Sequence, residues 1–237
     1  MVALQQNNRE ISAHDFRHEK KIYLPHANLQ EVRNMVCLLP NGFVECFPAR
    51  KVNNIYYDTI DFKHYYNHIN GTPDREKLRI RWYGALFSYI SNPKLELKIK
   101  RGRIGYKDVF SLPPFDFSKQ SINVQLEKIL QNSNLCKHQI EEYSGKYFPI
   151  LLNSYRREYW KIFGKPIRLT IDSNLEYYYP NTTQIFRSSL KQTGVIIELK
   201  FPNNDLDELD TILKHFQISF IKNSKYIAGV EKLYFYN

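Results

Sequence analysis

Charged residues alternate with aliphatic ones in several segments of the chain. Residues 94–100 read Lys-Leu-Glu-Leu-Lys-Ile-Lys, and similar alternation recurs over residues 77–82, 167–172 and 195–201. Side chains on a β-strand point to opposite faces with a period of two, so the lysines and Glu96 share one face and the aliphatic residues the other. Lys and Arg match phosphate oxygens, and carboxylates bind divalent metals. These segments therefore predict strands with one face suited to phosphate or metal chemistry.

Strands of this kind can close into a barrel with the charged faces inward and the apolar faces under helices. We therefore predict an α+β fold: an antiparallel β-barrel, or tunnel, of about eight strands with helices packed outside. The expected strands cover residues 15–24, 51–58, 76–84, 94–101, 104–112, 150–163, 167–179 and 194–201. The expected helices cover residues 28–39, 61–70, 123–143 and 206–216, and a final strand or short helix covers 225–235. The segment 123–143 could also form two helices parted near residues 132–134.

The composition limits the possible partners and cell compartments. The 237 residues carry a net charge of +10, which indicates an anionic partner, but helix-turn-helix, zinc-finger and basic-tail patterns are missing, so nucleic acid is not expected. No apolar run is long enough to span a membrane. Three widely spaced cysteines fit a reducing cytoplasm. We expect a polar arm over residues 1–14 and one domain over 15–237.

The presumed inward faces carry more cations than anions. The basic residues are Lys21, Arg79, Arg81, Lys98, Lys100, Arg157, Arg168, Lys200 and Lys225, and the acidic ones are Glu19, Glu96, Asp172 and Glu198. Enclosed like charges repel strongly, and a chain of phosphates would compensate them. The carboxylates could then bind a divalent metal that bridges phosphates, because Mg²⁺ usually takes one or two carboxylates plus substrate oxygens.

The order of these motifs resembles a known family. Arg17-His-Glu-Lys-Lys21 is similar to the Glu-x-Glu-x-Lys opening of triphosphate tunnel metalloenzymes. Further motifs, in order from about residue 15 to 235, resemble the VTC (vacuolar transporter chaperone) polyphosphate polymerase domain. They are Asn54-Ile-Tyr-Tyr-Asp58, Leu78-Arg-Ile-Arg-Trp-Tyr-Gly84, Glu96-Leu-Lys98, Tyr155-Arg-Arg157, Arg168-Leu-Thr-Ile-Asp172, Ile197-Glu-Leu-Lys200 and Ser224-Lys-Tyr226.

This resemblance implies a tunnel barrel, ATP as phosphoryl donor, Mn²⁺ or Mg²⁺ as cofactor and inorganic polyphosphate as product. The residues expected to act in catalysis are Arg79, Arg81, Lys98, Arg157 and Arg168. Those expected to bind phosphates are Lys21, Lys100, Lys107, Lys200 and Lys225. Glu198 would be the metal ligand, whereas Glu19 and Glu96 are equally suited to metal binding and to salt bridges with lysines. Arg17 replaces the first motif glutamate of the hydrolytic enzymes, which weakens a hydrolytic two-metal interpretation.

Several alternatives stay open at this point. A hydrolase of triphosphates and a non-catalytic polyphosphate sensor could use the same scaffold. The spacing of His64 with His68, and of His14 with His18, could serve a metal, but solvent-facing histidines are favoured because no third ligand is in place. The tyrosines at 177–179 are expected to pack in a strand or at the rim, with adenine stacking as the other reading.

Overall fold

A computed structural model describes residues 17–39, 42–102, 104–118, 129–133, 135, 137–180, 189–202, 212, 214 and 224–236. Its strands are β1 (Arg17–Leu24), β2 (Phe43–Asp58), β3 (Arg75–Tyr83), β4 (Tyr89–Ile90), β5 (Lys94–Arg101), β6 (Ile104–Ser111), β7 (Phe115–Asp116), β8 (Phe148–Ile162), β9 (Arg168–Tyr178), β10 (Leu190–Gln192) and β11 (Val195–Pro202). Its helices are α1 (Leu29–Cys37), α2 (Lys63–Ile69), α4 (Lys137–Tyr143), α6 (Lys225–Val230) and the π-helical turn η4 (Glu231–Phe235).

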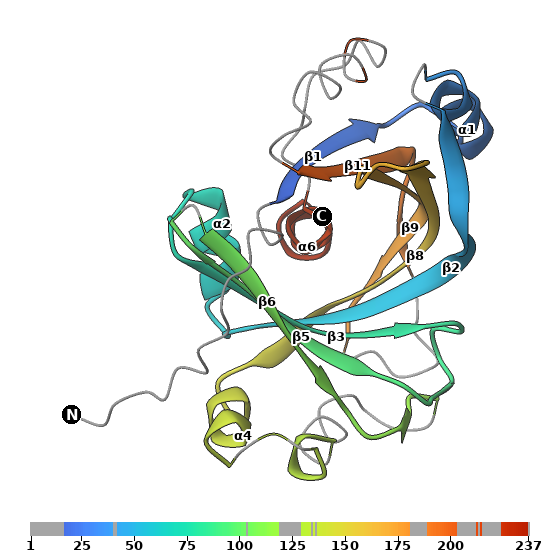
Figure 1. The fold of residues 1–237 in the computed structure, drawn as a ribbon. Coiled ribbons are helices and arrows are strands. Elements are labelled where there is room, and N and C mark those ends of the chain that lie inside the picture. The colour runs from blue at the N-terminus through green and yellow to red at the C-terminus, as the bar shows by residue number, and fades with distance from the viewer. Residues whose placement is uncertain are drawn as a thin grey trace.

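Antiparallel pairing joins the main strands in the order β1-β11-β9-β8-β2-β3-β5-β6, with β10 added to β9. The sheet curls strongly, so that β1 and β11 lie across from β5 and β6 (Figure 1). No backbone pairing joins β1 to β6 within the described residues. Even so, Lys98 on β5 reaches within 3.8 Å of Glu19 on β1. The expected antiparallel α+β fold is confirmed, with a seam between the two end strands.

Most of the expected elements are confirmed, and the short strands β4, β7 and β10 are additional to them. Strand β2 begins at Phe43, although a strand was expected only from residue 51, because bulges between residues 45 and 50 disturb its alternation. Within residues 123–143, which are described only in part, helical residues at 129–131 are followed by a turn and then by α4, which matches the alternative of two helices parted near residues 132–134. The expected helix over 206–216 and the arm over 1–14 lie outside the described residues, apart from 212 and 214.

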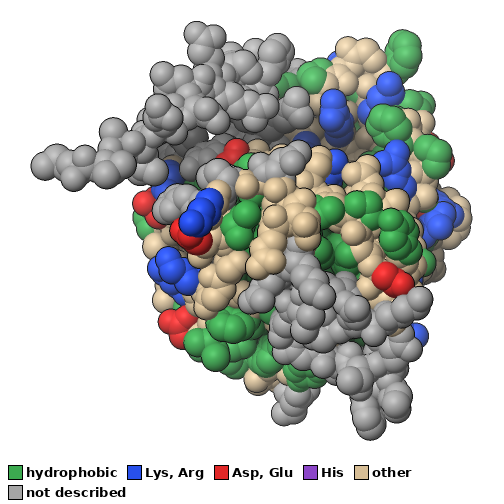
Figure 2. Space-filling view, turned by 90° about the horizontal axis from the view of Figure 1, so that it is seen from below, with side chains coloured by type: hydrophobic (Ala, Val, Ile, Leu, Met, Phe, Trp, Pro, Cys, Tyr) green, Lys and Arg blue, Asp and Glu red, His purple; other side chains and the backbone are tan. Residues whose placement is uncertain are grey.

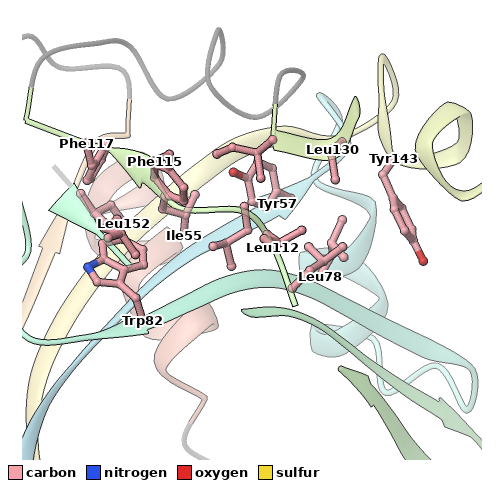
Figure 3. Close-up of a cluster of buried hydrophobic side chains, with 14 of the residues drawn as sticks. Ile55, Tyr57, Leu78, Trp82, Leu112, Phe115, Phe117, Leu130, Tyr143 and Leu152 are labelled. Atoms are coloured by element: carbon pink, nitrogen blue, oxygen red, sulfur yellow. The ribbon is translucent and has the colours of Figure 1, made fainter. Parts of the chain in front are cut away.

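The convex face of the sheet is apolar and covered. Figure 3 shows Trp82, Ile55 and Leu152 beneath Phe115 and Phe117. The other half of this face packs under α1, whose buried residues are Val32 and Val36. Helix α1 begins at a capping box: Asn28 Oδ1 accepts from the Glu31 amide at 3.0 Å, and Glu31 Oε2 accepts from the Asn28 amide at 2.8 Å. Helices on the apolar face were expected, and α1 confirms this.

Helix α6 lies on the opposite, concave face, unlike the helices that were expected to pack outside. Its Tyr226, Ile227 and Val230 share a buried cluster with Leu151 and Ile196. Register pairs Leu151 with Tyr56 and Ile196 with Asp172, so this cluster shares a face with charged residues. Figure 1 shows α6 inside the curve of the sheet. One end of the concave face is therefore filled by a helix.

Helix α2 is anchored through Asp58, the last residue of β2. One carboxylate oxygen accepts from the His64 amide at 2.8 Å, and the other accepts from the Tyr65 amide at 3.0 Å and from the Tyr226 hydroxyl. His64 is buried and stacks on Tyr147 with ring centroids 5.4 Å apart. The expectation that His64 faces solvent is therefore wrong.

The other predicted histidine pair, His14 and His18, lies outside the residues whose side chains the structure describes. None of the described helices combines the length and apolar character that a membrane span requires. Lys and Arg side chains are spread over the described part of the face in Figure 2, among exposed hydrophobic side chains. The charged side chains described next, however, gather on the concave face of the sheet.

Candidate active site on the concave face

Two arginines of β3 lie at the centre of the concave face. Arg79 faces Glu96 across the β3–β5 pair and donates from Nε to Glu96 Oε2 at 2.7 Å. Its other side donates to the Tyr56 hydroxyl at 3.1 Å. Arg81 donates from Nε to Asn54 Oδ1 at 2.8 Å and from Nη2 to the Tyr155 hydroxyl at 3.3 Å. Each guanidinium is thus held from two sides.

Glu96 is buried among cations. Besides Arg79, its carboxylate contacts Lys107 Nζ at 3.0 Å and Arg81 Nη1 at 3.8 Å. Burial alone would raise the pKa of Glu96, but attraction to Arg79, Arg81 and Lys107 outweighs burial and lowers the pKa to about 2. Of the two roles left open for Glu96, this arrangement matches the salt bridge.

A third guanidinium belongs to Arg157 on β8. It makes a bidentate pair with Asp172 of β9, at 2.6 and 2.7 Å, and lies 3.7 Å from Glu198. Lys225, the first residue of α6, contacts the same Asp172 at 2.5 Å from the other side. Burial would raise the pKa of Asp172, but Arg157 and Lys225 lower it overall. Asp172 therefore holds Arg157 and the start of α6 in place.

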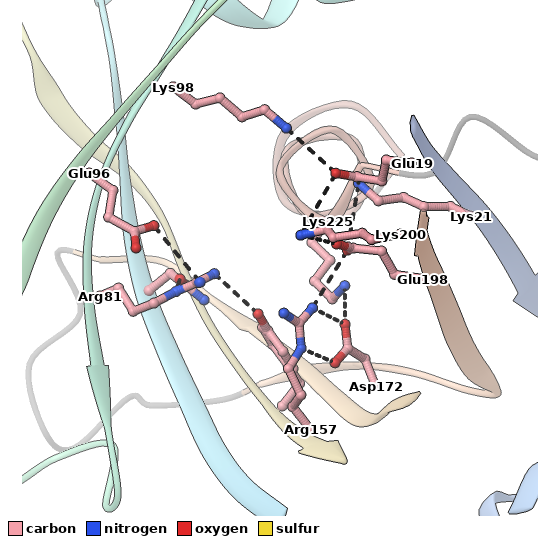
Figure 4. Close-up of polar contacts among 12 residues, drawn as sticks. Glu19, Lys21, Arg81, Glu96, Lys98, Arg157, Asp172, Glu198, Lys200 and Lys225 are labelled. Atoms are coloured by element: carbon pink, nitrogen blue, oxygen red, sulfur yellow. Dashed lines mark hydrogen bonds and ion pairs between the residues drawn. The ribbon is translucent and has the colours of Figure 1, made fainter. Parts of the chain in front are cut away.

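Two lysines and two glutamates alternate at the β1–β11 pair. Register places Lys21 opposite Glu198 and Glu19 opposite Lys200. Glu198 Oε1 lies 2.8 Å from Lys200 Nζ, and Lys21 contacts both Glu19 and Glu198. Burial would raise the pKa of Glu198, but Lys21, together with Arg157 and Lys200, holds it well below its usual range. Figure 4 shows these side chains on one side of the concave face, with Lys98, Glu96 and Arg81 on the other.

Three lysines form a row across β3, β5 and β6, because Lys77 pairs with Lys98 and Lys98 with Lys107. Lys98 and Lys107 were expected in the site, but Lys77 was missed. The sequence pattern could have identified it, because Lys77 alternates with apolar residues in step with Arg79 and Arg81 and so lies on the same face of the strand. Lys77 Nζ lies 2.9 Å from Ser224 Oγ, just before α6.

The remaining predicted residues lie nearer the ends of the strands. Arg168 opens β9 and shares a face with Asp172, but its side chain is exposed. Lys100 faces Arg75 near the end of β5 and is half-buried. Tyr177 and Tyr178 are buried, as expected for strand packing. The structure thus brings the other predicted residues together, and leaves Arg168 and Lys100 at the periphery.

A divalent metal fits the β1–β11 side of the concave face better than the β3–β5–β6 side. Among the described residues, no cluster of three or more His, Cys, Asp or Glu side chains comes together. Glu19 and Glu198 nevertheless lie close together, because Lys200 Nζ is 4.0 Å from Glu19 Oε2 and 2.8 Å from Glu198 Oε1. Two hard carboxylates suit Mg²⁺ or Mn²⁺ when phosphate oxygens complete the coordination. On the β3–β5–β6 wall, by contrast, Glu96 is surrounded by cations.

Comparisons with known proteins agree with this geometry. The family model "VTC domain" matches residues 16–234. No curated protein matches the sequence. Among solved structures, a proposed adenylate cyclase from Bacillus halodurans has a TM-score of 0.55 at 16% identity, covering 93% of this chain and 98% of that one. A proposed adenylyl cyclase from Hippeastrum, HpAC1, described as having a dominant triphosphatase activity, has a TM-score of 0.51 at 18% identity, covering 92% and 96%.

A third structure, from Vibrio parahaemolyticus, is also described as a proposed adenylate cyclase. Its TM-score is 0.50 at 15% identity, with 90% of this chain and 98% of that chain covered. At these identities the structures show a shared fold. The family match is broader evidence, because it spans nearly the whole chain and includes every site residue described above. The protein therefore belongs to the VTC domain family, within the triphosphate tunnel fold.

Proposed function

We propose that this protein is an ATP-dependent polyphosphate polymerase that uses a divalent metal, Mn²⁺ or Mg²⁺. The observation that carries the proposal is the fixed arginine centre, formed by Arg79, Arg81 and Arg157 on one concave face. To catalyse phosphoryl transfer, a protein mainly has to position the reactants in line and to neutralise charge on the transferred phosphoryl group. Planar guanidinium groups that are already oriented serve both needs.

In the proposed reaction a terminal oxygen of the polyphosphate chain attacks the γ-phosphorus of ATP. A new P–O bond forms there, the bond to the β–γ bridging oxygen breaks, and ADP leaves with that oxygen. The chain grows by one phosphate. A terminal phosphate oxygen is already ionised near neutral pH, so the step needs no dedicated general base.

The surrounding residues take supporting roles in this proposal. The lysines of both walls and Arg168 hold the donor and chain phosphates, namely Lys21, Lys77, Lys98, Lys100, Lys107, Lys200 and Lys225. Glu198, with Glu19 beside it, holds the metal. A bound metal would neutralise charge on the phosphates and polarise the bond that breaks. We place the activity in the cytoplasm, where ATP is plentiful and the free thiols of Cys37 and Cys46 stay reduced.

The test is to incubate the purified protein with ATP and Mn²⁺ and to separate the products on a gel. Long phosphate chains together with ADP are expected. A matched sample of Arg81→Ala should give neither product at a comparable rate. Orthophosphate without chains would overturn the polymerase proposal in favour of hydrolysis.

Triphosphate hydrolysis is the second candidate. The Hippeastrum neighbour is described as a triphosphatase, and one fold can host both reactions. Water, unlike a phosphate oxygen, must lose a proton during attack. Glu19 and Glu198 are both engaged by lysines, so a hydrolase would have to free one of them as a base. Binding of ATP without any turnover would instead indicate a sensor.

A further inference from the structure

A group of aromatic side chains surrounds Arg50 on the first half of β2. The guanidinium carbon lies 5.4 Å from the ring centroid of Tyr83 on β3 and 5.7 Å from that of Tyr159 on β8. Phe47 contacts Tyr159 edge-on, with centroids 6.1 Å apart and planes at 87°. Three neighbouring strands thus contribute planar groups to one place.

Strand register places this group on the concave face. Arg50 pairs with Arg157, and Tyr159 pairs with Thr170, which is opposite Glu198. Tyr83 pairs with Val52. The group lies toward the C-terminal end of β3 and the N-terminal end of β9, whereas α6 packs on Leu151, Ile196 and Tyr177 toward the other end. It therefore lies at the end of the concave face away from α6.

Most of the group is exposed, and Tyr159 is half-buried. Tyr83 is 49% exposed and Phe47 is 57% exposed, and the Arg50 side chain is exposed as well. The arginines further inside are tied to carboxylate or amide oxygens. Among the described residues, Arg50 has only its two ring contacts. Exposed planar groups of this kind offer stacking surfaces to a flat ligand.

We propose that Arg50, Tyr83 and Tyr159 bind the nucleobase of the nucleotide donor by stacking. This inference rests on the function proposed above and names the part of the donor that these residues recognise. Arg81 and Arg157 lie one same-face position inward from Tyr83 and Tyr159, which is about 7 Å along a strand. A nucleotide has a ribose between its base and its phosphates, so the base reaches the rings while the phosphates reach the arginines.

Stacking also predicts how selective the site is. Base–aromatic stacking tolerates different bases, because every base has a flat π-face. The site therefore accepts ATP and GTP with similar affinity. Inorganic triphosphate, which has no base, gains nothing from these residues and is bound by the charged centre alone.

The experiment compares ATP and inorganic triphosphate as ligands by calorimetric titration. Tyr83→Ala should weaken ATP binding about tenfold, while the affinity for triphosphate stays unchanged. Tyr83→Phe should restore ATP binding, since it keeps the ring. Tyr89→Ala is the matched control, because Tyr89 is 65% exposed on β4, outside the main sheet, and should change neither affinity.

Two results would overturn the inference. Equal losses for ATP and triphosphate in Tyr83→Ala would make the group a phosphate contact, and unchanged ATP binding in both Tyr83→Ala and Tyr159→Ala would remove it from the site. Wild-type protein that binds neither ligand would overturn the proposed function as well, so the two failures are distinguishable. Melting temperatures of the variants would identify any that fail to fold.

Discussion

The ammonium group of Lys77 lies 2.9 Å from the hydroxyl of Ser224, and this contact joins the wall of the sheet to the cap of α6. Burial, followed by repulsion from neighbouring cations, lowers the pKa of Lys77 to about 7. Those cations are Lys21, Lys98, Arg75 and Arg79. The charge of Lys77 is therefore sensitive to pH near neutrality.

The first prediction concerns stability against pH. The folded state lowers the pKa of Lys77 from its ordinary 10.5, so between about pH 7 and 10.5 the unfolded state binds more protons. The contribution of Lys77 to the free energy of unfolding should therefore rise with pH across this window. Urea unfolding of wild type and Lys77→Met at pH 7 and pH 9.5 checks this. The variant should show a smaller rise, and parallel curves would contradict the assignment.

The second prediction concerns acid. The pKa of Glu96 is lowered from 4.5 to about 2, so its ion pairs stabilise the fold fully above pH 4.5 and are lost as the pH falls toward 2. Glu96→Gln should lower the free energy of unfolding at pH 7 by about 3 kcal/mol. The difference from wild type should shrink toward zero near pH 2. A difference that is constant with pH would show that charge is not the cause.

The third prediction separates the two arginines of β3. Arg81→Ala should reduce turnover by about 10²–10³ and cost less stability than Arg79→Ala, because its hydrogen-bond partners Asn54 and Tyr155 are neutral and its contact with Glu96 is longer, at 3.8 Å. Arg79→Ala should reduce turnover similarly and also lower the melting temperature, because it removes a partner of buried Glu96. Arg101→Ala, an exposed arginine paired with Glu76, is the control. Normal turnover in both β3 variants would make these arginines purely structural.

The fourth prediction tests the metal site. Glu198→Gln keeps the shape of the side chain but removes the charge that a hard cation needs. Activity across a Mn²⁺ titration should collapse, while triphosphate binding in chelator should persist or tighten, because a repelling anion is gone. If Glu198 only positions Lys200, 2.8 Å away, the variant should instead keep its metal-dependent turnover. Glu19→Gln, measured in parallel, tests whether both carboxylates contribute.

The fifth prediction concerns the packing of α6 against the sheet. A Cβ atom on Gly229 would come within 2.6 Å of Leu151 Cδ2 and 2.7 Å of Tyr177 Cδ1. Gly229→Ala should therefore destabilise the protein by about 1–3 kcal/mol. Gly105→Ala is the matched control, since the nearest atom there is 3.6 Å away. Equal melting temperatures for the two variants would show that α6 can shift without cost.

Much of the main sheet could be predicted from sequence, because each strand has one charged and one apolar face. Period-two alternation found β3, β5 and β9 with small errors at their ends. The first half of β2 could not be predicted, since its bulges break the period of two. The side of the sheet on which α6 packs could not be predicted either. Its apolar residues fit any core, and only contacts distant in sequence, such as that of Tyr226 with Asp58, select the concave face.

The two-sided hold on Arg79, Arg81 and Arg157 affects the entropy of binding. Fixing a long, flexible side chain costs up to about 2 kcal/mol in lost rotamers, and for these arginines that loss occurs when the chain folds. The side chains of Lys98, Lys107 and Lys200 are 60%, 45% and 41% exposed, so much of their ordering is deferred until a ligand arrives. A phosphate at the arginine centre therefore gains nearly the whole of its electrostatic attraction as binding free energy. A phosphate held by the lysines gains only part of that attraction, because their side chains must first be ordered, and it can leave more readily.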